Sequence, residues 1–271
     1  MIDWNDAFDN SGYILGAADL IETWSNKAAA YRQSMLAAGC AEFNIGYGNE
    51  ARNKFDLFIP EKKSKGLVVF VHGGFWHMLD KSYWSHLAKG AVDQGWSVAI
   101  PSYTLAPDAK ITQITQEIAI AISCASAMVD GPIRLVGHSA GGHLVTRMVC
   151  VDSPLPTVIL PRVSGVVSIS GIYDLRPLTL TNMNQVLGLT DDEAIAESPA
   201  FLSPRQAIPI CFWVGDEERP EFLRQNRLIC EVWLKNSSLV DACYQSGKHH
   251  FSVIDDLAIA NSPLIEKLTA Q

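Results

Sequence analysis

A short motif near the middle of the chain, Gly137-His138-Ser139-Ala140-Gly141, has the residue types and spacing of a nucleophile turn. A mostly apolar run over residues 133–136 precedes it and helix-compatible residues follow, which predicts the order strand, sharp turn, helix. Such a turn holds the serine in a strained backbone conformation with its hydroxyl beyond the end of the sheet. Gly137 and Gly141 are expected where strand and helix approach too closely for a Cβ. Because the helix begins directly after Ser139, its free amides would face a developing oxyanion.

A serine hydroxyl is a poor nucleophile at neutral pH and needs a general base within hydrogen-bond reach. The base is usually a histidine, and a carboxylate holds its tautomer. His249 and His250 follow the last predicted strand, and we favour His250, which directly precedes the final helical segment. Asp216, Glu217 and Glu218 follow the strand before it. An acid a few residues past the strand end reaches the last loop best, so we favour Glu218 and keep Asp216 as the alternative.

Backbone amides that can stabilise an oxyanion are expected from two loops. One is the amide of Ala140, and another should come from Gly73 or Gly74, where the absence of a side chain lets the backbone approach a substrate closely. Four aromatic residues also follow strand ends and could either bind a flat acyl or aryl group or pack the loop layer: Phe75, Trp76, Tyr103 and Tyr173. Three histidines near these turns are expected to brace or pack rather than to do chemistry: His72, His138 and His143.

An α/β fold would bring these residues together. Buried strands are predicted over residues 66–71, 97–100, 133–136, 164–170, 208–214 and 240–244, after a hairpin over 43–48 and 54–60. Helices are predicted over 17–36, 83–94, 111–129, 221–234 and 253–268, and directly after Ser139. This alternation indicates a mostly parallel sheet of about eight strands with helices on both faces. The candidate residues follow strand ends, at the edge of the sheet where sites in such folds lie.

We expect one domain over residues 1–271, with an N-terminal helical arm over 1–40 and a small lid-like insertion over 172–205. Most of that insertion is irregular, and loops of such length are uncommon unless they act as lids or binding loops. The arm carries three aromatic residues that could line a pocket, although packing of the arm onto the body is the favoured interpretation: Trp4, Phe8 and Trp24.

Composition and charge limit the partners. The 271 residues are 48% hydrophobic and 18% charged, which is enough for a large core. A net charge of −8 without a long basic run argues against nucleic acid, and no apolar stretch is long enough to suggest a membrane. The N-terminus lacks the apolar segment of a secretory signal, and the six cysteines are scattered with no Cys-x-x-Cys. We therefore expect a cytoplasmic protein and leave its oligomeric state open.

The motifs resemble those of the α/β-hydrolase superfamily, in its esterase branch with a His-Gly-Gly loop. More narrowly, the sequence is similar to the kynurenine formamidase (arylformamidase) type of serine hydrolase, and the resemblance covers nearly the whole chain. It rests on five segments: His72-Gly73-Gly74-Phe75-Trp76, Gly137-His138-Ser139-Ala140-Gly141, Ser170-Gly171-Ile172-Tyr173-Asp174-Leu175-Arg176-Pro177, Pro220-Glu221-Phe222 and His250-Phe251.

The resemblance implies hydrolysis of a small-acyl ester or an aryl formamide like N-formyl-kynurenine through an acyl-serine, with no cofactor and no metal. It also implies the chain order serine, acid, histidine, read here as Ser139, Glu218 and His250. Animal formamidases usually carry aspartate at the acid position, so the glutamate keeps Asp216 in consideration. The family's lipase-like relatives have His-Gly-Gly-Gly, whereas Trp76 follows the phenylalanine here. We expect Trp76 to narrow the acyl pocket to formyl or acetyl groups.

Other functions would use the same motifs or the same fold. A thioesterase or a generic carboxylesterase would use the same three residues, and the sequence does not separate them. A non-catalytic binding protein with a hydrolase fold usually lacks a member of the triad, and none is missing here. A metal-dependent hydrolase is disfavoured, because His72 and His77 do not have the His-Glu-x-x-His spacing. The expected partner is therefore a small-molecule acyl ester or formamide.

Overall fold

The computed structural model describes residues 2–205, 208–235 and 239–270. Its strands are β1 (Ala41–Gly46), β2 (Lys54–Phe58), β3 (Leu67–Val71), β4 (Ser97–Pro101), β5 (Ile133–His138), β6 (Val163–Ile169), β7 (Ile210–Gly215) and β8 (Val240–Gln245). Within the described residues they form one sheet in the order β1-β2-β4-β3-β5-β6-β7-β8. Strand β2 is antiparallel to both of its neighbours, and the other pairs are parallel. The predicted mostly parallel sheet of about eight strands is confirmed.

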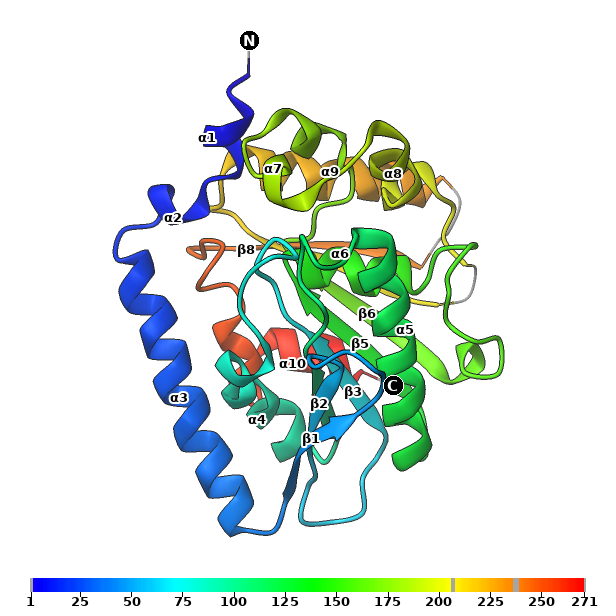
Figure 1. Cartoon of the computed structure of the whole chain (residues 1–271). Helices are drawn as coiled ribbons and strands as arrows, with labels where there is room; N and C mark the ends of the chain where they lie inside the picture. The colour runs from blue at the N-terminus through cyan, green and yellow to red at the C-terminus, as the bar shows by residue number, and fades with distance from the viewer. Residues whose placement is uncertain (1, 206–207, 236–238, 271) are drawn as a thin grey trace.

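Helices cover both faces of this sheet (Figure 1). On one face α5 (Ile111–Met128), α6 (Ala140–Arg147) and α9 (Pro220–Leu234) pack against the strands, and on the other lie α3 (Ala17–Ala37), α4 (Lys89–Asp93) and α10 (Pro263–Thr269). The shorter elements are α1 (Trp4–Phe8), α2 (Asn10–Tyr13), α7 (Asn184–Leu187), α8 (Asp191–Ala196) and the 3₁₀ turns η1 (Lys81–Tyr83), η2 (Ser85–Ala88), η3 (Leu160–Arg162), η4 (Arg176–Leu180), η5 (Pro199–Phe201) and η6 (Asp255–Ala258).

The central strands are buried along their whole length. Every residue of β3, β4, β5 and β7 is buried, as expected for strands covered by helices on both faces. Because these strands run in the same direction, their carboxyl ends meet at one edge of the sheet. The loops after β3, β5, β7 and β8, which carry the candidate residues, therefore lie along that edge.

Two segments that the sequence predicts as continuous helices are interrupted in the structure. The segment 253–268 is not one helix but η6 followed by α10, because Ser262 caps the amide of Ile265 at 3.1 Å and Pro263 opens a new helix. The segment 83–94 begins at the last residue of η1 and continues as η2 and α4. Between η1 and η2 the backbone of Trp84 leaves the helical range at φ −120°, ψ 0°, and its indole packs against Trp24 with ring centroids 4.7 Å apart.

The N-terminal arm and the insertion between β6 and β7 lie together over the carboxyl edge of the sheet, where Figure 1 draws α1 close to α7. The Asn5 side chain accepts a hydrogen bond from the amide of Asn182 at 2.7 Å. Arg219 forms an ion pair with Asp6 and donates to the carbonyl of Asp9 at 3.2 Å. Segments far apart in the sequence thus form one cover, although its lid-like movement stays a prediction.

Candidate active site

Ser139 lies in a sharp turn between β5 and α6. Its backbone has φ 55° and ψ −118°, a strained region for a residue with a side chain, and its amide donates to Ile169 O at 2.8 Å. The flanking glycines are required by close approach: a Cβ on Gly137 would lie 2.1 Å from Gly141 O, and one on Gly141 would lie 1.9 Å from Val71 O. These distances confirm the predicted crowding of strand, turn and helix.

His250 and Glu218 form a buried pair. His250 Nδ1 lies 2.7 Å from Glu218 Oε2, and each residue is 3% exposed. The other carboxylate oxygen accepts from the Gly215 amide at 2.9 Å and from the Ser170 hydroxyl. An ionised carboxylate only accepts hydrogen bonds, so Nδ1 carries the hydrogen and Nε2 is left as the basic nitrogen.

The loop of His250 is tied to the residue before the serine. His138 Nε2 donates to the His250 carbonyl at 2.9 Å, and the two rings are 4.6 Å apart. Burial, helped by the neighbouring His250, holds the pKa of His138 well below its ordinary value. His138 is therefore a neutral donor that fixes the backbone of the histidine loop relative to the nucleophile turn, as its expected bracing role requires.

The alternative candidates have other contacts. Asp216 is exposed, and its carboxylate accepts from the Gly247 amide at 2.7 Å. His249 Nδ1 accepts from the amides of Phe251 and Ser252, each at 3.2 Å. Both side chains stabilise the turn after β8. The structure thus places Glu218, rather than Asp216, beside a histidine.

The His-Gly-Gly loop runs along the other side of the serine. A Cβ on Gly73 would lie 3.0 Å from Ser139 Cβ, and Gly74 has φ +112° with room for no side chain, since its Cβ would meet Met78 O at 2.3 Å. His72 Nδ1 donates to Gly73 O at 2.7 Å, and burial lowers the pKa of His72 to about 4. A neutral histidine therefore holds Gly73 next to the serine, directly before α6 begins at Ala140.

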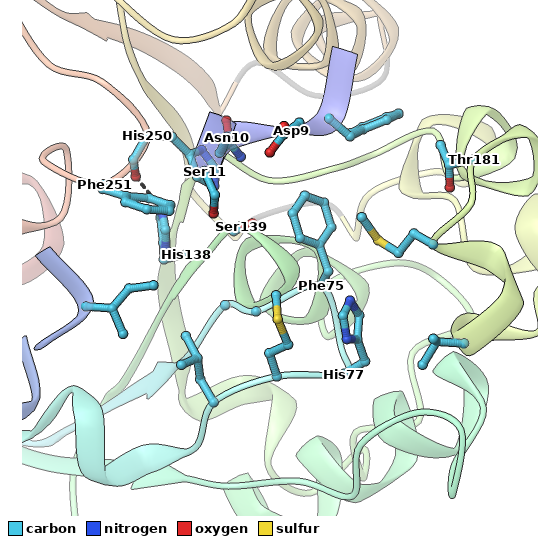
Figure 2. A pocket seen from close by; sticks show the side chains of 18 of the residues that line it. Asp9, Asn10, Ser11, Phe75, His77, His138, Ser139, Thr181, His250 and Phe251 are labelled. Carbon is cyan, nitrogen blue, oxygen red and sulfur yellow. Dashed lines mark hydrogen bonds between the residues drawn. The ribbon is translucent and has the colours of Figure 1, made fainter. Parts of the chain in front are cut away.

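A cavity of about 420 Å³ opens over these groups, and Ser139 and His250 both line it. Figure 2 shows them with His138 toward one end, and with Phe75 and His77 farther along. Most of the remaining wall is apolar and comes from four segments: the arm, the loop after β3, the insertion between β6 and β7, and the loop after β8. It comprises Asn5, Phe8, Asp9, Asn10, Ser11, Ile21 and Trp24 of the arm, Gly73, Gly74, Met78, Leu79 and Trp84 after β3, and Thr181, Met183, Val186 and Phe251.

Comparison with known proteins identifies the family. The BD-FAE family model matches residues 55–191, half of the chain. The chain belongs to the BD-FAE family. It is 27% identical to the kynurenine formamidase of Danio rerio, over 98% of this chain and 91% of that protein, and 30% identical to that of Salmo salar, over 94% and 90%.

Solved structures extend the comparison. A provisionally assigned thioesterase from Silicibacter sp. TM1040 is 46% identical over the full length of both chains, with a TM-score of 0.94. Esterase B of Lactobacillus rhamnosis shares the fold at 18% identity, with a TM-score of 0.65. The predicted α/β-hydrolase fold is confirmed, and this BD-FAE member is an ester or amide hydrolase.

The aromatic wall of this BD-FAE chain differs from the sequence prediction. Phe75 lines the cavity, but Trp76, Tyr103 and Tyr173 are fully buried and take no part in its lining. The rings of Trp76 and His143 form a T-shaped pair with centroids 5.2 Å apart, and the narrowing of the acyl pocket by Trp76 stays a prediction. Tyr103 stacks on the histidine of the His-Gly-Gly loop, and Tyr173 hydrogen-bonds a buried serine. These residues pack the loop layer.

The arm supplies cavity residues that sequence reasoning did not favour or missed. Phe8 and Trp24 line the cavity, and they also pack the arm onto the body. Asn10 and Ser11 were not singled out, because no motif surrounds them and they precede every strand. The apolar spacing of the arm predicts which of its residues are buried, but it does not indicate that the polar residues among them line a cavity.

The six cysteines are free thiols, and burial raises the pKa of Cys150, Cys211 and Cys230 to about 12. Across residues 2–205, 208–235 and 239–270, no cluster of three or more histidine, cysteine or acidic side chains is placed to hold a metal ion. No helix in those ranges is both long and apolar enough to cross a bilayer.

Proposed function

We propose that the chain is a serine hydrolase in which Ser139 is the nucleophile, His250 the general base and Glu218 the acid that orients it. The observation that carries this proposal is the buried Glu218–His250 pair, because its histidine lines the same cavity as a serine held in a strained strand-to-helix turn. Backbone strain that the surrounding packing maintains at a serine lining a cavity is typical of a catalytic turn.

In the proposed mechanism, His250 Nε2 takes the proton of Ser139 as its oxygen attacks the substrate carbonyl. The oxyanion is stabilised by amides of Gly73 or Gly74 and of Ala140, each worth roughly 100- to 1000-fold in turnover. The carbonyl carbon then loses its alcohol or amine, which receives the proton from His250. Water, deprotonated by the same histidine, attacks the acyl-serine and releases the acid and the free serine.

The proposed substrate is a small-acyl ester or an aryl formamide like N-formyl-kynurenine. Similarity to two kynurenine formamidases over nearly the whole of this chain supports the formamide. A mostly apolar cavity of about 420 Å³ also suits an aromatic leaving group, which needs far more space than a formyl group. The arm and the insertion 172–205 are proposed to cover this leaving group.

A thioesterase is the second candidate, because the structure that is 46% identical over its full length carries that name. The same serine and histidine attack thioesters, so mechanism does not separate the two. Six unpaired cysteines in the described chain support a reducing compartment such as the cytoplasm, where both kinds of substrate would be met.

The deciding experiment compares turnover of N-formyl-kynurenine, p-nitrophenyl acetate and S-phenyl thioacetate by the wild type and Ser139→Ala. We expect preference for the formamide, and a loss of roughly a millionfold on all three in the variant, since residues of a triad act as a unit. Preference for the thioester would replace the formamidase assignment by the second candidate. Near-normal activity of Ser139→Ala would overturn the mechanism itself.

A further inference from the structure

Asn10 is a buried asparagine whose amide group has no partner in the protein. The residue is 3% exposed, and no described residue hydrogen-bonds its Oδ1 or its Nδ2. It also lines the cavity that holds Ser139. Leaving both ends of a buried amide unpaired is costly, so such a group in a cavity wall points to a ligand that pairs with it.

Hydrogen bonds hold the backbone around Asn10 in place, which fixes where its side chain joins the cavity wall. The carbonyl of Asn10 accepts from the Ile14 amide at 2.9 Å. The preceding Asp9 accepts from the Gly12 amide through its side chain at 2.8 Å, and from Arg219 through its carbonyl at 3.2 Å. Arg219 follows the proposed triad acid in sequence, which anchors this part of the arm to the catalytic loop.

The arm lies on the histidine side of the serine. The Phe8 ring is 6.1 Å from the ring of Phe222, which is itself 4.3 Å from the His250 ring. Figure 2 likewise draws Asn10 and Ser11 toward the end of the pocket where His250 lies, away from His77. The general acid must reach the departing atom, so the leaving group occupies this side. Asn10 is therefore placed to contact the leaving group rather than the acyl group.

We propose that Asn10 is a specificity-determining residue that hydrogen-bonds the leaving group and selects aryl formamides over aryl esters. Its Oδ1 accepts from the N–H of the scissile amide, and its Nδ2 donates to a carbonyl or similar acceptor on the leaving group. An ester has oxygen in place of the N–H and leaves Oδ1 unpaired. Sites built to hydrogen-bond a substrate N–H discriminate strongly against analogues that lack it. This inference rests on the proposed function.

The test uses formanilide and phenyl formate, which differ only in N–H against O at the bond that breaks. We compare the ratio of their kcat/KM values in the wild type, Asn10→Leu and Asn10→Ser. We expect the formanilide-to-formate ratio to fall about 10- to 100-fold in both variants, since one hydrogen bond in a dry site is at stake. Phenyl formate serves as the reference substrate, and its kcat/KM should fall less than that of formanilide in each Asn10 variant.

Asn226 offers a matched control. It is 1% exposed on α9, both atoms of its amide also lack a partner among the described residues, and it does not line the cavity. Asn226→Leu should leave the ratio unchanged. Asn10→Leu should not lower the midpoint of urea unfolding, because it replaces an unpaired buried amide by an apolar side chain of similar size.

The outcomes separate this inference from the proposed function. Equal losses on both substrates in the Asn10 variants, or the same change of ratio in Asn226→Leu, would refute the role of Asn10. So would a wild type that cleaves phenyl formate but not formanilide, although the hydrolase itself would stand. A wild type that cleaves neither substrate would instead overturn the proposed function.

Discussion

Glu218→Gln tests the electrostatic core of the mechanism. Glutamine keeps the shape of the side chain and can still accept from the Gly215 amide, which the carboxylate contacts at 2.9 Å. Its NH₂ group would face His250 Nδ1, forcing the hydrogen onto Nε2, so the nitrogen proposed to take the proton of Ser139 is no longer basic. The imidazolium also loses a negative charge about 4 Å away, worth about 4 kcal/mol at an effective dielectric constant of about 20. That energy corresponds to about 1000-fold in kcat.

The assay is kcat for p-nitrophenyl acetate, with urea unfolding as a check that each variant is folded. Asp216→Asn is the matched control, because Asp216 is exposed and an asparagine oxygen can still accept from the Gly247 amide. It should stay within about threefold of the wild type. If Glu218→Gln keeps more than a tenth of wild-type kcat, or if Asp216→Asn loses more, the acid has been assigned to the wrong residue.

Two further predictions concern the neighbours of the serine. Gly73→Ala should lower kcat for an aryl formamide about tenfold, because the added Cβ would lie 3.0 Å from Ser139 Cβ and push the loop by a fraction of an ångström. The midpoint of urea unfolding should stay nearly unchanged. An unchanged kcat would contradict a role for this loop. Burial lowers the pKa of His143 to about 3, so between pH 3 and 6.5 the unfolded chain binds the extra proton and stability falls as the pH falls. The wild type should therefore lose more unfolding free energy between pH 7 and pH 5 than His143→Gln does, by about 2 kcal/mol, as measured by urea unfolding at both pH values. An equal loss in the two proteins would show that His143 protonates in the folded state.

The fold was predictable from the sequence where every residue of a helix or strand has the same surroundings. Strand β3 is apolar throughout because helices cover both of its faces, and the sequence predicts its bounds to within one residue. The final helix failed for the opposite reason. Its apolar spacing continues from Val253 to Leu268 because η6 and α10 pack into the same cluster, although the chain breaks between them. Ser262 followed by Pro263 is a helix-start signal, and it outweighs that spacing.

The sequence predicts which loops carry the candidate triad, but not which carboxylate of its loop faces the histidine. Chain order and strand ends indicate which loops meet, because parallel strands bring their carboxyl ends to one edge. The choice between Asp216 and Glu218 depends on the turn after β7. There the Glu218 amide donates to Gly215 O at 3.3 Å, whereas the Asp216 amide donates to Gln245 O at 3.0 Å. Those bonds turn one carboxylate inward and the other outward, and neither follows from composition or spacing.

The cavity wall was the least predictable part, and the reason is chemical. A nucleophile turn constrains residue types, since only glycine fits at 137 and 141, and so it leaves a motif in the sequence. A wall that binds a leaving group needs only volume and a few polar atoms, which many sequences supply. The family match over residues 55–191 includes Ser139 and the His-Gly-Gly loop but not the arm that carries Asn10. The arm over residues 1–40 thus lies outside the family match, and it is where we expect the choice of leaving group to be determined.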